Sequence, residues 1–253
     1  MTTAPAVSIS QRDPALLGQT VVVIGGSSGI GRETARHARA EGADLILTGL
    51  HADGLEQTAA ELGALSYSAL DATDPAALDR FFGDLPKTID HVMVTGPGPY
   101  YAPLADLDRE RARRNFDAHE WLAVAVAQHA VGRVRPGGTL LFMAGTAGAR
   151  GQGLSLSAAQ TAALPALIAN LALELAPIRA NLIAAGFVDT GLSASLLGAN
   201  LEARREQLRT TLPIGRVVGP ADVAALAVHI MINTALTGGT YDIDGGEQLV
   251  SGG

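Results

Sequence analysis

One stretch of sequence, VVVIGGSSGIG at 21–31, points most directly to the fold, and the helix-forming run RETA at 32–35 follows it. A β-branched apolar run leads into a glycine-rich turn with the spacing G-x-x-x-G-x-G. This order of strand, turn and helix is the one that a dinucleotide-binding fingerprint requires. A turn that only shapes the backbone is the alternative, and the agreement between spacing and context favours a bound cofactor.

Each glycine of this turn has a separate expected role. Gly25 permits the tight turn, Gly29 lets the backbone approach a pyrophosphate, and Gly31 allows the helix to pack closely on the sheet. The free N–H groups at the start of the helix then face the phosphates. The candidate phosphate-binding residues are Gly25, Ser27, Ser28, Gly29, Ile30 and Gly31.

Composition and charge limit the number of domains and the kinds of binding partner that we expect. With 253 residues, 47% of them hydrophobic, we expect a single domain at 19–253 behind a loose arm at 1–18. The arm lacks the features of a signal peptide, so a cytoplasmic protein is expected. The net charge of −7 argues against nucleic acid as a partner, and no apolar run is long enough to predict a membrane span. Without cysteine, and with six histidines that lack metal-binding spacing, no metal site is expected.

Strand and helix patterns alternate along the chain. Strands separated by helices predict parallel pairing with right-handed crossovers, and so an α/β, doubly wound Rossmann-type domain with a parallel seven-stranded sheet. After the first strand, strands are expected at 45–48, 65–70, 91–95, 139–143, 178–184 and 240–243. Helices are expected near 55–62, after Asp74 and Pro75, through Trp121 to His129, up to 171–175 and from Pro220.

At this point the chain resembles the short-chain dehydrogenase/reductase family over nearly its whole length. The glycine stretch is similar to the family's T-G-x-x-x-G-x-G, with Ile24 in place of the threonine. The acidic turn DATD at 71–74 follows the third strand, and TGPG at 95–98 stands in place of the family's N-N-A-G. The segment AGFVDT at 185–190 is similar to P-G-x-V-x-T, and DGG at 244–246 completes the pattern.

The resemblance implies further cofactor contacts and a mode of assembly. Asp71 would meet the adenine, and Val188 and Thr190 the nicotinamide carboxamide. Residues 191–212 would form a lid over a small-molecule substrate, and the apolar helix at 158–175 would join subunits into a homodimer or homotetramer. The cofactor-binding residues added in this way are Leu50, His51, Asp71, Ala72, Gly96, Pro97, Gly98, Gly186, Val188 and Thr190.

The family's catalytic asparagine, serine and Y-x-x-x-K pair are replaced in this chain. Counting back from the later L-A-L-E-L-A-P segment, Ser157 falls on the tyrosine position and Thr161 on the lysine position. The serine position falls on Gly145, or on Ala144 with an offset of one. His119 holds the asparagine position.

These replacements remove the usual acid. A phenol with a pKa of about 10 becomes a proton relay near neutral pH only when a cation stabilises its phenolate, and the single lysine, Lys87, precedes the fourth strand. The candidate catalytic residues are therefore His119, Ser157 and Tyr101. His119 has a structural alternative as a packed side chain, and Ser157 has one as the cap of an S-x-x-Q box. Tyr101, like Tyr100, is either a substrate contact or surface packing.

The end of the second strand bears on the choice of cofactor. In the family an aspartate there binds the ribose diol and selects NAD, whereas this chain has TGLH at 48–51. An acid would repel the 2′-phosphate of NADP, so its absence favours NADP(H) over NAD(H). Leu50 stands where NADP-dependent relatives commonly place arginine, which leaves His51 and Arg32 as candidates for the phosphate.

Three functions are open at this point. The first is a nicotinamide-dependent oxidoreductase acting on a pre-activated acceptor such as an iminium ion, because some family members without the tyrosine are linked to iminium reduction. The second is a non-catalytic NADP(H)-binding sensor or scaffold. The third is a carbonyl reductase with a non-standard proton donor, either His119 or a tyrosine of the site.

Overall fold

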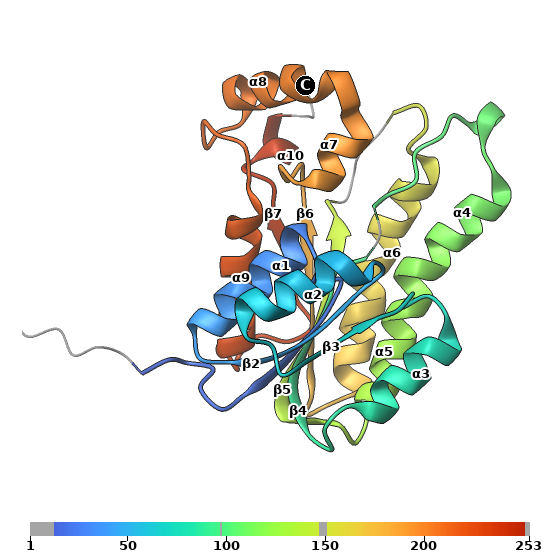
Figure 1. Cartoon of the computed structure of the whole chain (residues 1–253). Helices are drawn as coiled ribbons and strands as arrows, with labels where there is room; N and C mark the ends of the chain where they lie inside the picture. The colour runs from blue at the N-terminus through green and yellow to red at the C-terminus, as the bar shows by residue number, and fades with distance from the viewer. Residues whose placement is uncertain (1–12, 97, 147–150, 251–253) are drawn as a thin grey trace, which may run out of the picture.

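The computed structural model describes residues 13–96, 98–146 and 151–250, which form a seven-stranded parallel sheet with helices on both faces (Figure 1). The strand order is β3-β2-β1-β4-β5-β6-β7. The strands are β1 (Thr20–Ile24), β2 (Asp44–Gly49), β3 (Ser66–Ala69), β4 (Ile89–Val94), β5 (Val134–Gly145), β6 (Arg179–Ala185) and β7 (Thr240–Ile243). The predicted doubly wound sheet is confirmed.

Helices lie between the strands at the places that the sequence pattern predicted, and α7, α8 and α10 are additional to that prediction. They are α1 (Gly29–Ala40), α2 (Ala52–Leu62), α3 (Pro75–Asp84), α4 (Arg109–Phe116), α5 (Leu122–Ala130), α6 (Ser155–Glu174), α7 (Gly191–Leu197), α8 (Leu201–Thr211), α9 (Pro220–Ile232) and α10 (Glu247–Val250). Asp74 caps α3 as predicted, since its side chain accepts a hydrogen bond from the Ala76 N–H.

Alternate residues of the central strands pack into two separate hydrophobic cores, one on each face of the sheet. Val22 and Leu140 face α3, α5 and α6, whereas Val21 and Leu141 face α1, α2 and α9. This period of two, with both faces apolar, is what a parallel sheet covered on both sides requires. The central strands are therefore buried on both faces and carry the functional loops at their ends, whereas the edge strands β3 and β7 are more exposed.

β5 and the helix expected through Trp121 differ from the sequence expectation. β5 begins at Val134 rather than after the glycines at 137 and 138, and its register against β4 shifts between Ile89 and His91. The long helix expected through Trp121 is interrupted by a π-helical turn, η2 (Asp117–Trp121), between α4 and α5. Propensity does not reveal a single inserted residue, which is why the interruption was missed.

The chain enters the folded unit before the predicted boundary at residue 18. Leu16 is fully buried, and its N–H donates to the Glu41 carbonyl at 2.8 Å. Residues 1–12 of the predicted arm lie outside the described residues.

α6 starts earlier than expected, and this changes the role of Ser157. The helix begins at Ser155 after Leu154, with no side-chain cap, so the predicted S-x-x-Q capping box is wrong. Gln160 instead donates to the Asn115 carbonyl and to Glu120, both at 3.3 Å. In the part of the chain that the structure describes, α6 is the one helix long and apolar enough to cross a membrane; its Leu164 and Ile168 lie in the core beneath the sheet.

Candidate active site

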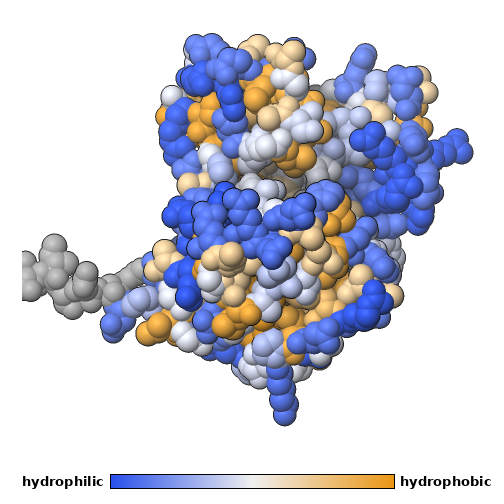
Figure 2. Space-filling view, viewed as in Figure 1, coloured by the Kyte–Doolittle hydropathy of each residue, from blue (hydrophilic) through white to orange (hydrophobic). Residues whose placement is uncertain are grey.

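The candidate site lies where the carboxyl ends of β1, β2, β4, β5 and β6 meet. Successive strands are added to one side of β1 up to β3 and to its other side from β4 onward. Ligands of open α/β sheets bind at such a topological switch point. In the space-filling view the surface is hollowed on this side, between the lid helices at the top and the helices below (Figure 2).

The glycine turn leaves no room for side chains at two positions. Gly25 has a φ of 88° and donates to the Thr48 carbonyl at 3.0 Å, and a Cβ on it would lie 2.2 Å from Thr95 Oγ1. A Cβ on Gly31 would lie 2.2 Å from the Gly25 carbonyl oxygen. These contacts hold α1 directly against the end of β1.

The first turn of α1 is arranged as an anion site. Ser28 precedes the helix in an extended conformation without making a side-chain cap, and the first turn holds no acidic residue. Gly29 has a φ of 53° and faces Thr190, whose Cγ2 would lie 3.7 Å from a Cβ at that position. The backbone from Ser27 to Gly31 therefore fits the pyrophosphate of a dinucleotide.

The end of β2 is open and carries no acid at residues 49–51, although the exposed Asp53 follows in the first turn of α2. Leu50 is 62% exposed and His51 is exposed at the start of α2. The Ser27 hydroxyl oxygen would lie 2.9 Å from a Cβ on Gly49, so this serine fills the place beside the strand end. Arg32 is engaged by Glu61 through an ion pair of 2.6 Å on the exposed surface.

The side chain of Asp71 stabilises the turn after β3. Asp71 Oδ1 accepts from the N–H of Thr73 at 2.9 Å and from its hydroxyl at 2.7 Å, while Ala72 is half-buried. Of the predicted residues in the loop after β4, Pro97 lies outside the described residues, and Gly96 and Gly98 flank it.

His119 lies in η2 with its ring against this loop. Its Nδ1 is 2.7 Å from the Asn115 carbonyl oxygen, so Nδ1 carries the proton. Its Nε2 would lie 3.5 Å from a Cβ on Gly96. Asn115 in turn donates to the Gly98 carbonyl at 2.9 Å, so η2 and α4 hold the loop from below.

The structure separates the two neighbouring tyrosines. Tyr100 is buried, its hydroxyl accepts from the Asp108 N–H at 3.0 Å, and the Arg111 guanidinium lies 4.6 Å from its ring centroid. Tyr100 is therefore a packing residue. Tyr101 is half-exposed; burial raises the pKa of its phenol, a hydrogen bond with Ser157 opposes this, and the charge of Glu247 raises it further.

Tyr101 and Ser157 are thus brought together from a loop and a helix that are far apart in the sequence. One turn further along α6, Thr161 Oγ1 donates to the Ala158 carbonyl at 3.1 Å. Its Cγ2 would lie 3.3 Å from a Cβ on Gly145. Thr161 therefore faces Gly145 at the end of β5, and Ser157 lies one turn earlier on α6.

The predicted lid consists of α7, a short 3-10 turn and α8. Thr190 begins α7 in a reciprocal cap with Ser193: the Ser193 N–H donates to Thr190 Oγ1, and the Thr190 N–H donates to Ser193 Oγ. A Cδ of Leu192 would lie 2.9 Å from a Cβ on Gly98, so α7 rests on the loop after β4. Val188 is buried and pairs with Val218 beneath the lid.

The comparisons with known proteins agree with this geometry. A family model described as enoyl-(acyl carrier protein) reductase matches residues 24–248. The chain belongs to the short-chain dehydrogenase/reductase family. It is 31% identical to a sorbitol dehydrogenase of Cereibacter sphaeroides, covering 92% of this chain and 98% of the relative. It is 29% identical to an L-rhamnose 1-dehydrogenase (NAD(P)(+)) of a Sphingomonas species, covering 91% and 96%.

A solved structure shares the fold over the same length. The MalC reductase/Diels-Alderase of Malbranchea aurantiaca superimposes with a TM-score of 0.84 at 24% identity, covering 94% of this chain and 99% of that one.

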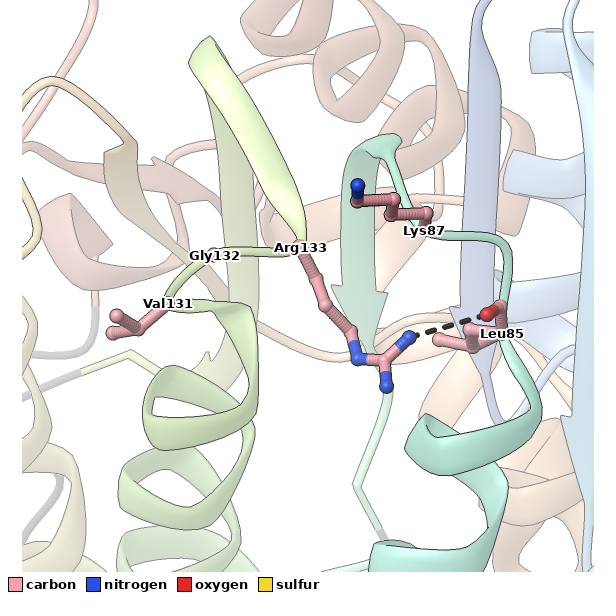
Figure 3. A pocket seen from close by; sticks show the side chains of 5 residues that line it. All are labelled: Leu85, Lys87, Val131, Gly132 and Arg133. Carbon is pink, nitrogen blue, oxygen red and sulfur yellow. Dashed lines mark hydrogen bonds between the residues drawn. The ribbon is translucent and has the colours of Figure 1, made fainter.

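The one lysine of this family member lies at the opposite end of the sheet. Lys87 lines a shallow hollow with Val131, Gly132 and Arg133, and Arg133 donates to the Leu85 carbonyl at 3.1 Å (Figure 3). These residues precede β4 and β5, at the amino ends of the strands. Lys87 is therefore remote from Ser157 and Tyr101.

Sequence reasoning missed two charged residues near the site. Glu247, at the start of α10, contacts the Phe187 N–H and Arg204 of the lid. Glu120 in η2 has a raised pKa because it is partly buried, and Gln160 opposes this shift. Only the position of Glu247 directly after the D-G-G segment could have pointed to it. Within 13–96, 98–146 and 151–250, no cluster of three potential metal ligands occurs.

Proposed function

We propose that this protein is an NADP(H)-dependent oxidoreductase that acts on a pre-activated acceptor such as an iminium ion. The observation that carries the proposal is the state of the hydroxyl groups on α6. The Thr161 hydroxyl donates a hydrogen bond to the Ala158 carbonyl within the same helix, and the Ser157 hydroxyl lies beside Tyr101. We place Ser157 and Thr161 at the family's tyrosine and lysine positions.

The residues present fit a nicotinamide dinucleotide. The backbone of Gly25, Gly29 and Gly31 would hold the pyrophosphate, and Val188 and Thr190 would hold the carboxamide of the nicotinamide. When bound, the reduced cofactor supplies a hydride. The printed names of the relatives, which are dehydrogenases, support redox chemistry over binding alone.

The proposed acceptor follows from whether the reduced product needs a proton from the protein. Reduction of a ketone places negative charge on oxygen, and a general acid at that point contributes about 10²–10⁴-fold. Burial raises the pKa of Tyr101, so its phenol is a weaker acid than usual. An iminium ion already carries positive charge and becomes neutral when it accepts a hydride, so it needs no acid.

The preference for NADP(H) rests on the end of β2. Gly49 and Leu50 carry no acid that would repel a 2′-phosphate. Arg32 can leave its exposed partner Glu61, because exposed ion pairs contribute only about 0–1 kcal/mol. Arg32→Gln should therefore weaken NADPH binding more than NADH binding.

A second candidate function is favoured by the contact between Tyr101 and Ser157. If Tyr101 gives a proton to a carbonyl oxygen, the protein is a carbonyl reductase with a relocated donor. Tyr101→Phe removes that proton and keeps the ring. Under the main proposal this variant leaves iminium turnover within about threefold of the parent, and under the second it lowers ketone turnover by about 10²-fold or more.

The experiment that tests the proposal compares two acceptors of similar shape. NADPH oxidation is followed with 3,4-dihydroisoquinolinium and with α-tetralone, using the parent and Tyr101→Phe. Turnover of the iminium alone supports the proposal. Turnover of the ketone that Tyr101→Phe abolishes supports the relocated donor, and tight NADPH binding without any turnover supports a cofactor-binding sensor.

A further inference from the structure

An ion pair with two hydrogen bonds joins the lid helix α8 to the segment that follows β6. Arg205 Nε donates to Asp189 Oδ2 at 3.0 Å, and Arg205 Nη2 donates to Asp189 Oδ1 at 2.7 Å. The third nitrogen of the guanidinium donates to Glu202 of the same helix at 3.2 Å. Two parallel bonds to one carboxylate fix the direction of both side chains as well as their distance. The position of α8 is therefore tied to the position of Asp189.

Asp189 stands between the two residues that are expected to hold the nicotinamide carboxamide, Val188 and Thr190. The Asp189 N–H donates to the Val218 carbonyl at 2.9 Å, and the Ser193 hydroxyl donates to the Val188 carbonyl at 2.8 Å. The backbone of this short segment is thus bonded to β-bridge and α7 residues, while its one charged side chain is bonded to α8. A shift of α8 would act on the segment through the Asp189 side chain.

A second arginine holds α8 to the same stretch of chain. Arg204 donates to Glu247 of α10, and Glu247 accepts from the Phe187 N–H at 3.3 Å. Arg209, one turn further along α8, instead pairs with Glu202 at 3.1 Å and with Glu206 at 3.0 Å, both on its own helix. Arginines of one helix therefore make two kinds of ion pair, and those at the start of α8 connect it to residues 187–189.

We infer that Arg205 is a positioning residue that, through Asp189, holds residues 188–190 in the conformation that binds the nicotinamide. The inference rests on the proposed function for the identity of the cofactor, and it adds the way in which the lid contributes to binding. A ligand that needs one conformation of a segment binds more weakly in proportion as that conformation is less populated. Loss of Arg205 should therefore weaken the binding of the nicotinamide half of the cofactor. The glycine turn lies on β1 and α1, so a ligand held by that turn alone should bind as before.

The test compares two ligands on the full-length protein by calorimetry. NADPH is one, and 2′-phospho-ADP-ribose, which carries the same phosphates and no nicotinamide, is the other. The parent should bind NADPH at least about tenfold more tightly than the fragment. Arg205→Gln should reduce this ratio at least about fivefold and change the affinity for the fragment less than about twofold. The matched control Arg209→Gln makes the same change of charge on the same helix and should keep the ratio.

A double-mutant cycle shows whether the two side chains act as a pair. Asp189→Asn should lower the ratio as Arg205→Gln does, and the double variant should lower it no further, because one interaction can be lost only once. Reductions that multiply in the double variant would overturn the pair as the positioning device. If Arg205→Gln does not fold, Arg205→Lys takes its place: a single ammonium group cannot form the same two parallel bonds, so the ratio should still fall, and an unchanged ratio contradicts the inference.

Three further outcomes would overturn the inference. These are a parent that binds NADPH no more tightly than the fragment, an unchanged ratio in Arg205→Gln, and an equal loss of affinity for both ligands, which would make the ion pair a general structural tie. An equal fall of the ratio in Arg209→Gln would also contradict it, since that residue makes no bond to Asp189.

The failure of this inference can be told apart from the failure of the proposed function. A NADPH preference that depends on Arg205, in a protein that turns over neither acceptor, keeps the inference and rejects the redox proposal. Iminium turnover with an unchanged ratio in Arg205→Gln does the reverse. A parent that binds neither ligand rejects both.

Discussion

His91 couples the stability of the fold to pH. It is 1% exposed, its Nε2 meets Gln19 Oε1 at 2.8 Å, and its Nδ1 has no hydrogen-bond partner among the described residues. Burial lowers its pKa from 6.5 to about 3, helped by the charges of Arg179 and Arg135. Below pH 6.5 the unfolded chain gains a proton that the folded chain refuses, so stability is lost as pH falls towards 3.

The corresponding prediction concerns His91→Leu. The parent should lose up to about 1.4 kcal/mol per pH unit more than this variant as the solution is acidified through that range. Denaturant unfolding of both proteins at a series of pH values measures the difference. Parallel pH profiles would show that His91 does not titrate differently in the folded and unfolded states.

Some site residues could be predicted from the sequence, and others could not. The glycines of the turn could be predicted, because glycine is the residue that fits both the positive φ of Gly25 and the 2.2 Å between a Cβ on Gly31 and the Gly25 carbonyl oxygen. The pairing of Tyr101 with Ser157 and the position of Glu247 depend on how separate loops fold over the sheet. No local spacing encodes such contacts.

At the scale of single elements, the contact between α1 and β1 is the most sensitive. A methyl group at Gly31 meets the Gly25 carbonyl, so Gly31→Ala should cost about 1–3 kcal/mol and abolish cofactor-induced stabilisation. Thermal melts with and without NADPH measure both effects.

The matched control is Gly54→Ala in α2, which meets nothing within 4 Å. It should raise stability by up to about 1 kcal/mol through helix propensity and keep cofactor binding. Unaltered NADPH binding in Gly31→Ala would contradict the fit of the glycine turn to a pyrophosphate.

Restoring the family's catalytic helix requires a change that the sequence did not suggest. Tyr101 lies against Ser157, so Ser157→Tyr needs space that Tyr101→Ala would provide. Combined with Thr161→Lys and Gly145→Ser, these changes should raise ketone turnover by about 10²–10⁴-fold. The same set without Thr161→Lys is the control and should stay inactive, because its phenol lacks a cation. Equal activity of both sets would contradict the role assigned to the missing lysine.

The central strands β1, β2, β4 and β6 were predictable because their apolar runs are buried on both faces. The interruption at η2 and the early start of α6 were not, because both depend on tertiary contacts. Gln160 is drawn to the Asn115 carbonyl and to Glu120, and the helix begins before Ser157. Here packing outweighs the local capping signal.

At the scale of the whole molecule, exposed apolar side chains support the predicted homodimer or homotetramer. Leu173 on α6 is 78% exposed and Trp121 on η2 is 64% exposed. Light scattering at micromolar concentration should give an oligomer, and Leu173→Glu should shift it towards the monomer. The control Leu65→Glu, at a 62% exposed position directly before the edge strand β3, should leave the oligomer unchanged. A monomeric parent would contradict the assembly.

The central claim is hydride transfer from NADPH to an acceptor that needs no acid. The most direct measurement uses NADPH deuterated at the transferable C4 position, with equal amounts of 3,4-dihydroisoquinolinium and α-tetralone in one reaction. Mass spectrometry of the products should find deuterium in the amine, at a rate exceeding that of the alcohol by about 10²-fold or more. Equal or faster labelling of the alcohol, or no label in either product from a protein that binds NADPH, would contradict it.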